Sequence, residues 1–386
     1  MSPRPPAEPR IGLATRRVLI FALLVAASET AAAQPADAPR AATGPTAAQT
    51  AVSTATTRPA TTQPRDTQSA APWTVAELRR EAEALRPIFE TELVTRFLDA
   101  TADLPKIAPR KLWRDADTRA YLLPGEVEKL APDRRAALLE RAADERVYYL
   151  TKYGSPLAYA RALELLAQHG LSDVRGRRVL DFGYGGIGHL RLLAALGADA
   201  VGVDVDSFLP ALYHEASDVG VVKGRHGHDG RVTLVNGRWP AEPEAVHAVG
   251  GAYDVILSKN TLKRGYIHPA RETDERMLIK LGVDDATFVK ALFDALKPGG
   301  VVLVYNLCPA AAPPDKPYIP WADGRSPFSR EAWEAAGFRV LAFDTQDDEA
   351  ARRMGAALGW DAGERQTKLA DDLFAWYTLV ERPAAP

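Results

Sequence analysis

The sequence feature that most constrains the fold is the stretch from Val179 to Asp206, VLDFGYGGIGHLRLLAALGADAVGVDVD. It begins with apolar residues typical of a buried parallel strand, continues with a helical pattern of leucine and alanine, and ends with a second apolar strand that finishes at Asp204. Between the first strand and the helix stand four glycines, which let a backbone turn sharply and approach a ligand closely. They are Gly183, Gly185, Gly186 and Gly188. A carboxylate at the position of Asp204 can accept the hydroxyls of an adenosine ribose, so the stretch predicts a nucleoside-cofactor site.

Two classes of cofactor fit such a site. Gly183, Gly185 and Gly188 match G-x-G-x-x-G, the fingerprint of dinucleotide binding. Asp181, however, stands two residues before the first glycine. A carboxylate there would repel the pyrophosphate of NAD but attract the ammonium group of S-adenosylmethionine, which favours the second cofactor.

Asp181 and the spaced glycines resemble the first motif of the class I S-adenosylmethionine-dependent methyltransferases. That family usually has its third glycine six residues after the acid, where this chain has Ile187 between two glycines. The turn Pro298-Gly299-Gly300 and two apolar segments near the end of the chain also resemble the family. The resemblance covers roughly residues 171–383. It implies a doubly wound, mostly parallel α/β sheet of seven strands with a reversed last strand, and S-adenosylmethionine as cofactor.

The pattern after Asp206 supports the same fold class. Apolar strands and helical segments keep alternating, as they do in doubly wound parallel sheets. In such a sheet the ligand lies at the carboxyl ends of the strands, so the residues that follow each strand are the candidates for the site.

The N-terminus predicts an export signal. Arg16 and Arg17 precede an apolar run, and small residues end near Ala33. We therefore expect residues 1–33 to be a cleaved signal peptide, and the protein to be periplasmic or extracellular. If the leader has another role, the protein is cytoplasmic. Residues 34–72 are almost wholly Ala, Thr, Pro, Gln and Ser, a composition typical of a flexible linker.

The overall composition excludes some classes of protein. The formal net charge of −2 gives no basic excess for nucleic-acid binding. The single cysteine, Cys308, excludes a disulfide framework within the chain, and no stable membrane span is expected once the signal is cleaved. The pattern His226-Gly227-His228-Asp229 lacks a second ligand pair, so no metal site is expected. No motif indicates the oligomeric state.

Residues 73–170 are expected to form a helical cap. Helices are predicted around Glu90–Ala100 and Pro132–Arg146, and from Pro156 to Gln168. Tyr149 and Tyr153 lie between the last two helices. These tyrosines either pack the cap onto the sheet or line a pocket for the substrate, and we take them as candidates for substrate binding.

The candidate cofactor residues follow the first four strands of the sheet. Besides Asp181, the glycines and Asp204, they are Asn236 after the third strand and Ser258 at the end of the fourth. The resembled family often has an Asp near Asn236 that meets the adenine amino group. Trp239 can stack on the adenine ring or belong to the core.

The fourth strand leads into a dense polar run, Lys259 to His268. Candidate catalytic residues in it are Asn260, which can orient an acceptor, and Tyr266 or His268, which can act as a base. Lys259, Lys263 and Arg264 are candidates for binding an anionic substrate group; the alternative is a solvated loop.

Three functions remain open from the sequence. The first is S-adenosylmethionine-dependent methyl transfer to a small-molecule acceptor. The second is an NAD(P)-dependent oxidoreductase that uses the same glycines, and the third is an exported, non-catalytic module that retains the methyltransferase fold.

Overall fold

The structure is a computed structural model that describes residues 73–224, 227–362 and 367–384. The expected signal peptide (1–33) and linker (34–72) lie outside these ranges and stay predictions. Within the described ranges, no helix has both the length and the apolar character needed to span a bilayer.

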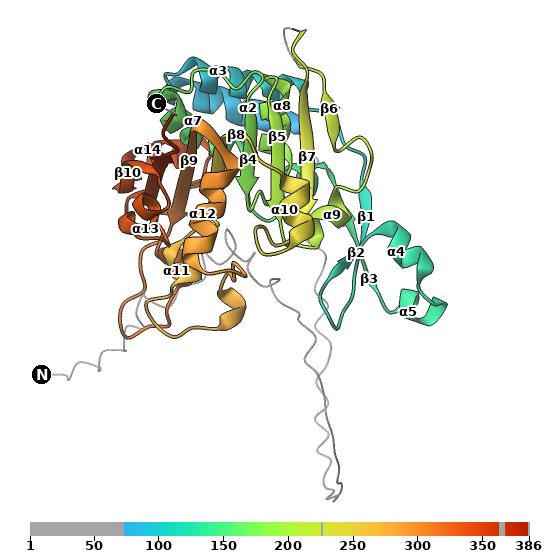
Figure 1. Ribbon diagram of the computed structural model, residues 1–386. Coiled ribbons are helices and arrows are strands. Elements are labelled where there is room, and N and C mark those ends of the chain that lie inside the picture. The colour runs from blue at the N-terminus through green and yellow to red at the C-terminus, as the bar shows by residue number, and fades with distance from the viewer. Residues whose placement is uncertain (1–72, 225–226, 363–366, 385–386) are drawn as a thin grey trace, which may run out of the picture.

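A mixed sheet of eight strands forms the centre of the molecule (Figure 1). Its order is β10-β11-β9-β8-β4-β5-β7-β6, and the five strands from β9 to β7 run parallel to one another. β11 lies between β9 and β10 and is antiparallel to both. The strands are β4 (Arg178–Phe182), β5 (Asp199–Asp204), β6 (Gly220–Val222), β7 (Gly230–Asn236), β8 (Tyr253–Lys259), β9 (Leu296–Cys308), β10 (Arg339–Gln346) and β11 (Phe374–Glu381).

This topology confirms the predicted α/β fold with a mostly parallel sheet, which resembles the Rossmann-like methyltransferase fold. The reversed β11 next to β9 is the feature that the resemblance implied. One strand was not predicted. β6 extends the sheet by pairing antiparallel with β7, and its three residues are too few to show a period in the sequence.

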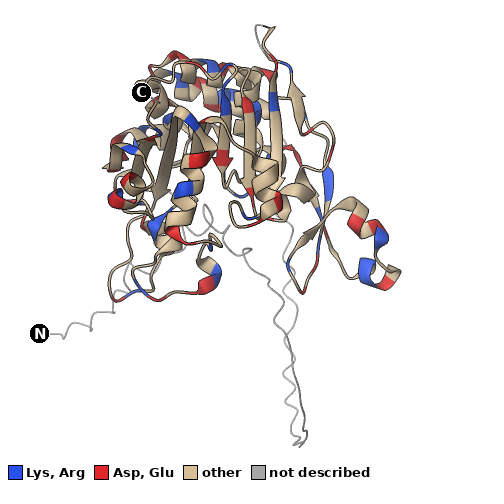
Figure 2. Ribbon diagram, viewed as in Figure 1, with Lys and Arg blue, Asp and Glu red and all other residues tan. Residues whose placement is uncertain are grey.

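Helices cover both faces of the sheet because successive side chains of a strand point to opposite faces, and apolar side chains of the central strands lie on both. Val179 and Leu257 belong to one buried cluster with α7 and α8, whereas Leu180 and Ile256 belong to a second cluster with α10 and α12. Several charged residues of these strands stand at strand ends, as Arg178, Asp204 and Lys259 do, and Figure 2 shows many others on the helices. The helices are α7 (Ala160–Gln168), α8 (Gly188–Ala195), α9 (Phe208–Leu212), α10 (Pro243–Val249), α11 (Arg264–Ile267), α12 (Asp285–Ala295), α13 (Arg330–Ala335), α14 (Asp348–Ala357) and α15 (Leu369–Asp372).

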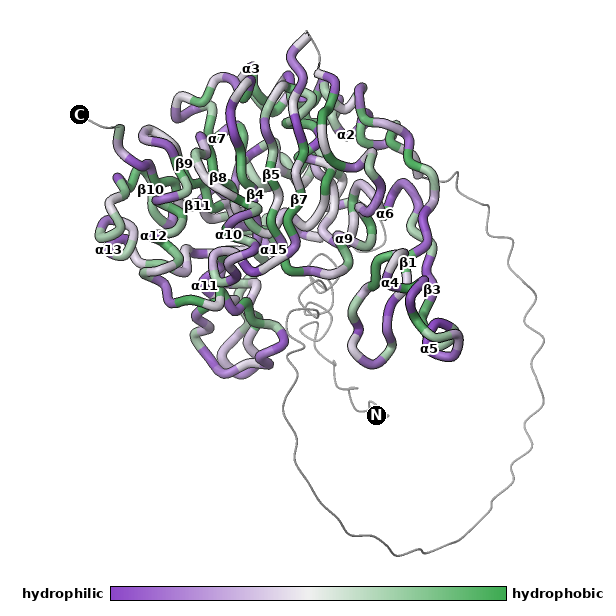
Figure 3. Tube along the Cα trace, turned by 45° about the vertical axis from the view of Figure 1, so that its right-hand side comes forward, coloured by the Kyte–Doolittle hydropathy of each residue, from purple (hydrophilic) through white to green (hydrophobic). Residues whose placement is uncertain are grey.

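The N-terminal region holds helices, as expected, but also a small sheet that the sequence did not predict. The expected helix over Pro132–Arg146 is wrong beyond Ala136, because residues 139–143 form β3, which pairs with β1. Together with β2 and two short helices, these strands make an arm that projects from the body (Figures 1 and 3). The elements are α2 (Val75–Leu85), α3 (Glu92–Asp99), β1 (Arg110–Arg114), β2 (Tyr121–Leu122), α4 (Pro124–Lys129), α5 (Pro132–Ala136), β3 (Leu139–Ala143) and α6 (Glu145–Leu150).

A buried ion pair ties the start of the arm to the central domain. Both terminal nitrogens of Arg110 donate to the carboxylate of Asp218, at 2.7 and 2.9 Å. The hydroxyl of Tyr148 donates to the same carboxylate at 2.9 Å, and the guanidinium lies over the Tyr148 ring. Because Arg110 and Asp218 are both buried, the two charges compensate each other inside the protein.

Candidate functional site

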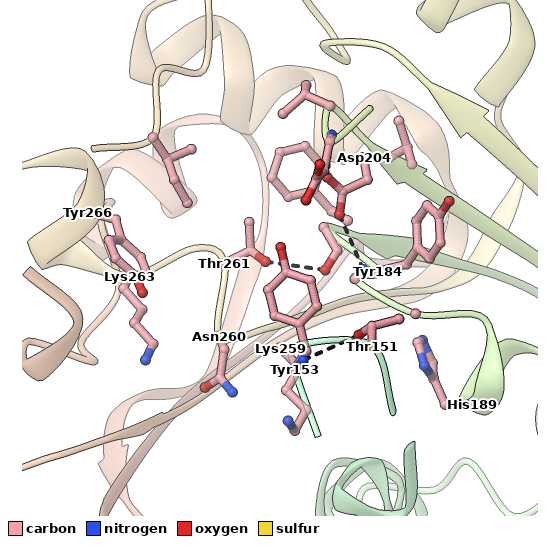
Figure 4. A pocket seen from close by; sticks show the side chains of 18 of the residues that line it. Thr151, Tyr153, Tyr184, His189, Asp204, Lys259, Asn260, Thr261, Lys263 and Tyr266 are labelled. Atoms are coloured by element: carbon pink, nitrogen blue, oxygen red, sulfur yellow. Dashed lines mark hydrogen bonds between the residues drawn. The ribbon is translucent and has the colours of Figure 1, made fainter. Parts of the chain in front are cut away.

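A cleft opens at the carboxyl ends of β4, β5, β7 and β8, where a doubly wound sheet is expected to bind its ligand (Figure 4). Each of these strands contributes the segment that follows it, and the cap supplies the facing wall. The main lining segments are Phe182–Gly186, Val203–Asp206, Gly237–Trp239, Lys259–Thr261 and Leu278–Leu281, with Tyr149–Thr151, Tyr153–Pro156 and Tyr159 from the cap.

The glycine loop after β4 forms the floor of the cleft. Gly183 and Gly185 have φ angles of 77° and 57°, a left-handed conformation that favours glycine. A Cβ on Gly183 would lie 2.2 Å from Oγ1 of Thr261, and one on Gly185 would lie 2.7 Å from the ring of Tyr153. Two side chains of the protein therefore cover this loop at van der Waals distance, and Tyr153 lies over the position where a cofactor would approach Gly185.

The other two glycines of the motif serve the packing of the cap. A Cβ on Gly186 would meet the side chain of Thr151 at 3.3 Å. Gly188 begins α8, and a Cβ there would lie 2.8 Å from Pro156. Gly186 lines the cleft, whereas Gly188 lies behind it and allows close contact between α8 and the cap.

Asp204 ends β5 on the cleft wall, as predicted. Its Oδ2 accepts from the backbone N–H of Gly185 at 3.2 Å, and its Oδ1 accepts from that of Asp206 at 3.0 Å. Loss of solvent raises the pKa of this carboxyl to about 6, and the charge of Asp206 adds to the shift. Asp206 itself pairs with Lys152, whereas no cation among the described residues pairs with Asp204. Asp204 is thus an acceptor suited to neutral hydroxyl groups.

Asp181 is fully buried on β4 and does not line the cleft. Its Oδ2 accepts from the hydroxyl of Tyr159 at 2.7 Å and from Nε2 of His189 at 2.6 Å. The rings of Tyr159 and His189 stack with their centroids 3.7 Å apart, and both face the cleft. Two side chains therefore stand between the carboxylate and the cleft, and the contact of Asp181 with the cofactor stays a prediction.

The end of β8 brings Lys259, Asn260 and Thr261 into the cleft, and the first two were predicted. Asn260 has a φ of 65°, and its Oδ1 accepts from the backbone N–H of Leu307 at 2.7 Å. Part of its amide thus holds the end of β8 against β9. Ser258 is buried and lies outside the cleft, where its hydroxyl accepts from the N–H of Leu262. The structure thus does not bring Ser258 into the cleft, and its contact with the cofactor stays a prediction.

The rest of the polar run divides into two groups. Lys263 and Tyr266 line the cleft. Nζ of Lys263 already donates to the carbonyl of Leu307 at 2.5 Å, and burial lowers its pKa to about 8. Arg264 and His268 do not line the cleft, since Arg264 pairs with Asp323 and His268 with Asp285. Their predicted roles in substrate binding and as a base stay predictions.

The end of β7, where a contact with adenine was expected, also differs from the expectation. The amide of Asn236 donates to the carbonyls of Asp204 and Asp206, at 3.1 and 3.4 Å, and Asn236 does not line the cleft. Gly237 and Trp239 lie on the wall instead, and Trp239 packs at an angle against Phe182 in the core. In the structure the amide of Asn236 holds the end of β5, and its contact with adenine stays a prediction.

Both candidate tyrosines of the cap line the cleft. Tyr149 is buried, and its hydroxyl donates to the carbonyl of Pro105 at 2.5 Å, so that it supports the wall. Tyr153 is 38% exposed and covers Gly185. It stands two residues after Thr151, a β-branched residue with a φ of 49°, which is a strained conformation for such a side chain.

No group of His, Cys, Asp and Glu side chains in the described part of the chain is arranged to hold a metal ion. His226 of the His226–Asp229 pattern lies outside the described residues. Cys308 is buried, and burial raises its pKa to about 11, so its thiol is not reactive.

Sequence reasoning missed Tyr159, His189 and Thr261. Each reaches the cleft through a contact between segments far apart in the sequence, as in the hydrogen bond from Thr261 to the carbonyl of Gly183. His189 directly follows the last glycine of the motif, and this position was the only available signal.

A scan against protein-family models found no match, and a search of curated proteins found none either. The solved structures similar to this chain include S-adenosylmethionine-dependent methyltransferases. One, from Mesorhizobium loti, is 17% identical over 58% of this chain and 98% of its own, with a TM-score of 0.34. Phosphoethanolamine N-methyltransferase 2 of Haemonchus contortus, bound to S-adenosylhomocysteine, is 16% identical over 64% of this chain and 63% of its own, with a TM-score of 0.35.

The cyclase SpnF is also similar, with 18% identity over 58% of this chain and 81% of its own and a TM-score of 0.35. These identities and TM-scores are low. The fold is therefore defined by the strand order and the reversed β11, and the residues of the cleft determine which reaction is possible.

Proposed function

We propose that this protein binds S-adenosylmethionine in the cleft and transfers its methyl group to a small-molecule acceptor. The observation that carries the proposal is Asp204, a desolvated carboxylate without a cationic partner among the described residues, beside the glycine loop of a sheet with a reversed β11. In such a sheet this position faces the ribose of a bound nucleoside.

The residues present fit the cofactor if Tyr153 moves. Asp204 would accept the ribose hydroxyls, and Gly183 and Gly185 would let the backbone approach the sulfonium end. Gly237 and Trp239 would contact the adenine. The ring of Tyr153 now fills the space over Gly185, so binding requires this ring to turn aside.

The cofactor supplies a methyl group on an activated sulfonium leaving group, so the protein chiefly has to align the acceptor and exclude water. Asn260 and Tyr266 line the part of the cleft that follows β8. Their amide and hydroxyl can hold an acceptor oxygen or nitrogen by hydrogen bonds. Tyr153 would then close over both reactants.

The reversed β11 favours this proposal over the NAD(P)-dependent oxidoreductase, since an ordinary dinucleotide fold has no need of such a strand. The non-catalytic module remains the second candidate, because the side chains of Thr261 and Tyr153 cover Gly183 and Gly185.

The test is a transfer assay with S-adenosylmethionine that carries a deuterated methyl group. The full chain is incubated with a fractionated small-molecule extract and analysed by mass spectrometry. We expect labelled methyl groups on a small molecule and an equal amount of S-adenosylhomocysteine. Binding of S-adenosylmethionine without any transfer would support the non-catalytic module, and oxidation or reduction of a nicotinamide cofactor would support the oxidoreductase.

We further propose that the protein is exported and loses residues 1–33. This proposal is supported by Arg16 and Arg17, by the apolar run that follows them and by the small residues near Ala33. The intact mass of the protein from its native host, with any ligand that co-purifies, tests it: a chain that still contains residue 1 contradicts export by a cleaved signal.

A further inference from the structure

Lys259 stands out among the lysines of the cleft. The ammonium groups of Lys152 and Lys263, which also lie at this edge of the sheet, have oxygen partners in Asp206 and Leu307. The Lys259 ammonium has no hydrogen-bond or ion-pair partner among the described residues and lies 5.1 Å from the centre of the Tyr159 ring. Burial lowers its pKa to about 8, as expected for a cation that has lost water and gained only an aromatic face.

The surroundings of Lys259 explain why it stays charged. Asp181 lies beneath and raises the pKa of the ammonium in opposition to burial. Tyr159 and His189 both hydrogen-bond to Asp181 and separate it from the cleft. The nearby negative charge is thus covered and fixed in position, whereas the positive charge of Lys259 faces the cleft.

The strand order fixes the place of Lys259 relative to Asp204. β5 and β8 lie on either side of β4, so the two residues flank the glycine loop. Two strand spacings amount to about 10 Å. The chain of atoms that joins ribose to carboxylate in extended S-adenosylmethionine spans a comparable distance. In Figure 4 the ring of Tyr153 lies between Asp204 and Lys259, along the path such a chain would take.

We propose that Lys259 binds the carboxylate of the amino-acid tail of S-adenosylmethionine, and thereby makes the cleft specific for a cofactor that carries this group. This inference rests on the proposed function. It also replaces the sequence-based expectation in which Asp181 attracts the ammonium group at this end of the cofactor. Asp181 acts as a positioning residue that holds Tyr159 under Lys259.

The test compares two ligands that differ only in the carboxylate, S-adenosylmethionine and its decarboxylated form. Their affinities are measured by titration calorimetry with the full chain, with Lys259→Met, which keeps the length of the side chain, and with Lys259→Arg, which keeps the charge. Lys290→Met is the matched control, since this lysine is exposed and pairs with Asp294 on the outside of α12.

We expect the unaltered protein and Lys290→Met to prefer S-adenosylmethionine by about ten- to a hundredfold, as for a hydrogen bond between charged groups. Lys259→Met should bind both ligands equally and weakly, and Lys259→Arg should keep a preference. An unaltered protein that binds both ligands equally overturns the inference without using any variant, as does a Lys259→Met protein that keeps the preference. Failure of the unaltered protein to bind either ligand overturns the proposed function and the inference together.

Discussion

Replacement of Asp204 by Asn should stabilise the protein while weakening its ligand binding. The carboxyl of Asp204 has its pKa raised from 3.8 to about 6 by burial, against the effect of the N–H groups of Asp206 and Gly185 that donate to it. This rise in pKa corresponds to about 3 kcal/mol of the free energy of unfolding, which is lost when the carboxyl of Asp204 ionises. The amide avoids that cost but accepts one hydrogen bond fewer, worth about 1 kcal/mol. We therefore expect a net gain of about 1 to 2 kcal/mol at about pH 8.

The sign of the pH dependence follows from linkage. Because the folded state holds the proton more tightly than the unfolded state, the stability of the unaltered protein falls as the pH rises from about 4 to about 6. The advantage of Asp204→Asn should therefore be small at about pH 5 and complete at about pH 8. Urea unfolding of both proteins at the two pH values measures it.

Asp254→Asn is a control for which the opposite change in stability is expected. Although burial raises the pKa of Asp254, hydrogen bonds from Lys297 and from the backbone of Arg178 hold it below the usual range, so this variant should lose stability at neutral pH. An Asp204→Asn protein that is less stable than the unaltered one at about pH 8, or a gain that does not vary with pH, would refute the reasoning. Its affinity for S-adenosylmethionine should fall about tenfold, because the amide accepts fewer ribose hydroxyls.

Three further variants test other parts of the structure. Arg110→Met leaves Asp218 buried without its cation and should lower the free energy of unfolding by about 3 to 5 kcal/mol, measured by urea denaturation; a change near zero would mean that the arm is not tied to the domain in this way. Tyr153→Ala uncovers Gly185 and should speed association with S-adenosylmethionine in stopped-flow measurements, whereas slower association would mean that the ring does not block entry. His268→Ala should leave the affinity for S-adenosylmethionine unchanged in calorimetry, since this side chain pairs with an acid outside the cleft; a tenfold loss would return His268 to the site.

The parts of the fold that were predictable are those with local signals. Gly183 and Gly185 adopt left-handed conformations that the motif requires, and Asp204 ends its strand at the expected spacing. β3 could not be predicted in this way. Four of its five residues are exposed, so its sequence, LERAA, has no apolar alternation that separates a strand from a helix.

The candidate site was predictable to the extent that strand ends determine it. Lys259 and Asn260 follow β8 directly and lie in the cleft. His268 lies nine positions after Lys259 in the sequence, and the short helix α11 carries it out of the site. The contact of Asp181 with Tyr159 depends on how α7 packs against the sheet, and no spacing in the sequence encodes that packing.

Binding of S-adenosylmethionine in the cleft is tested most directly by calorimetric titration of the full chain with S-adenosylmethionine and NAD in parallel, together with the Asp204→Asn variant. We expect saturable binding of S-adenosylmethionine at one site, with about tenfold weaker binding by the variant and no heat from NAD. Binding of NAD in place of S-adenosylmethionine, or binding of S-adenosylmethionine that is the same in both proteins, would contradict this expectation.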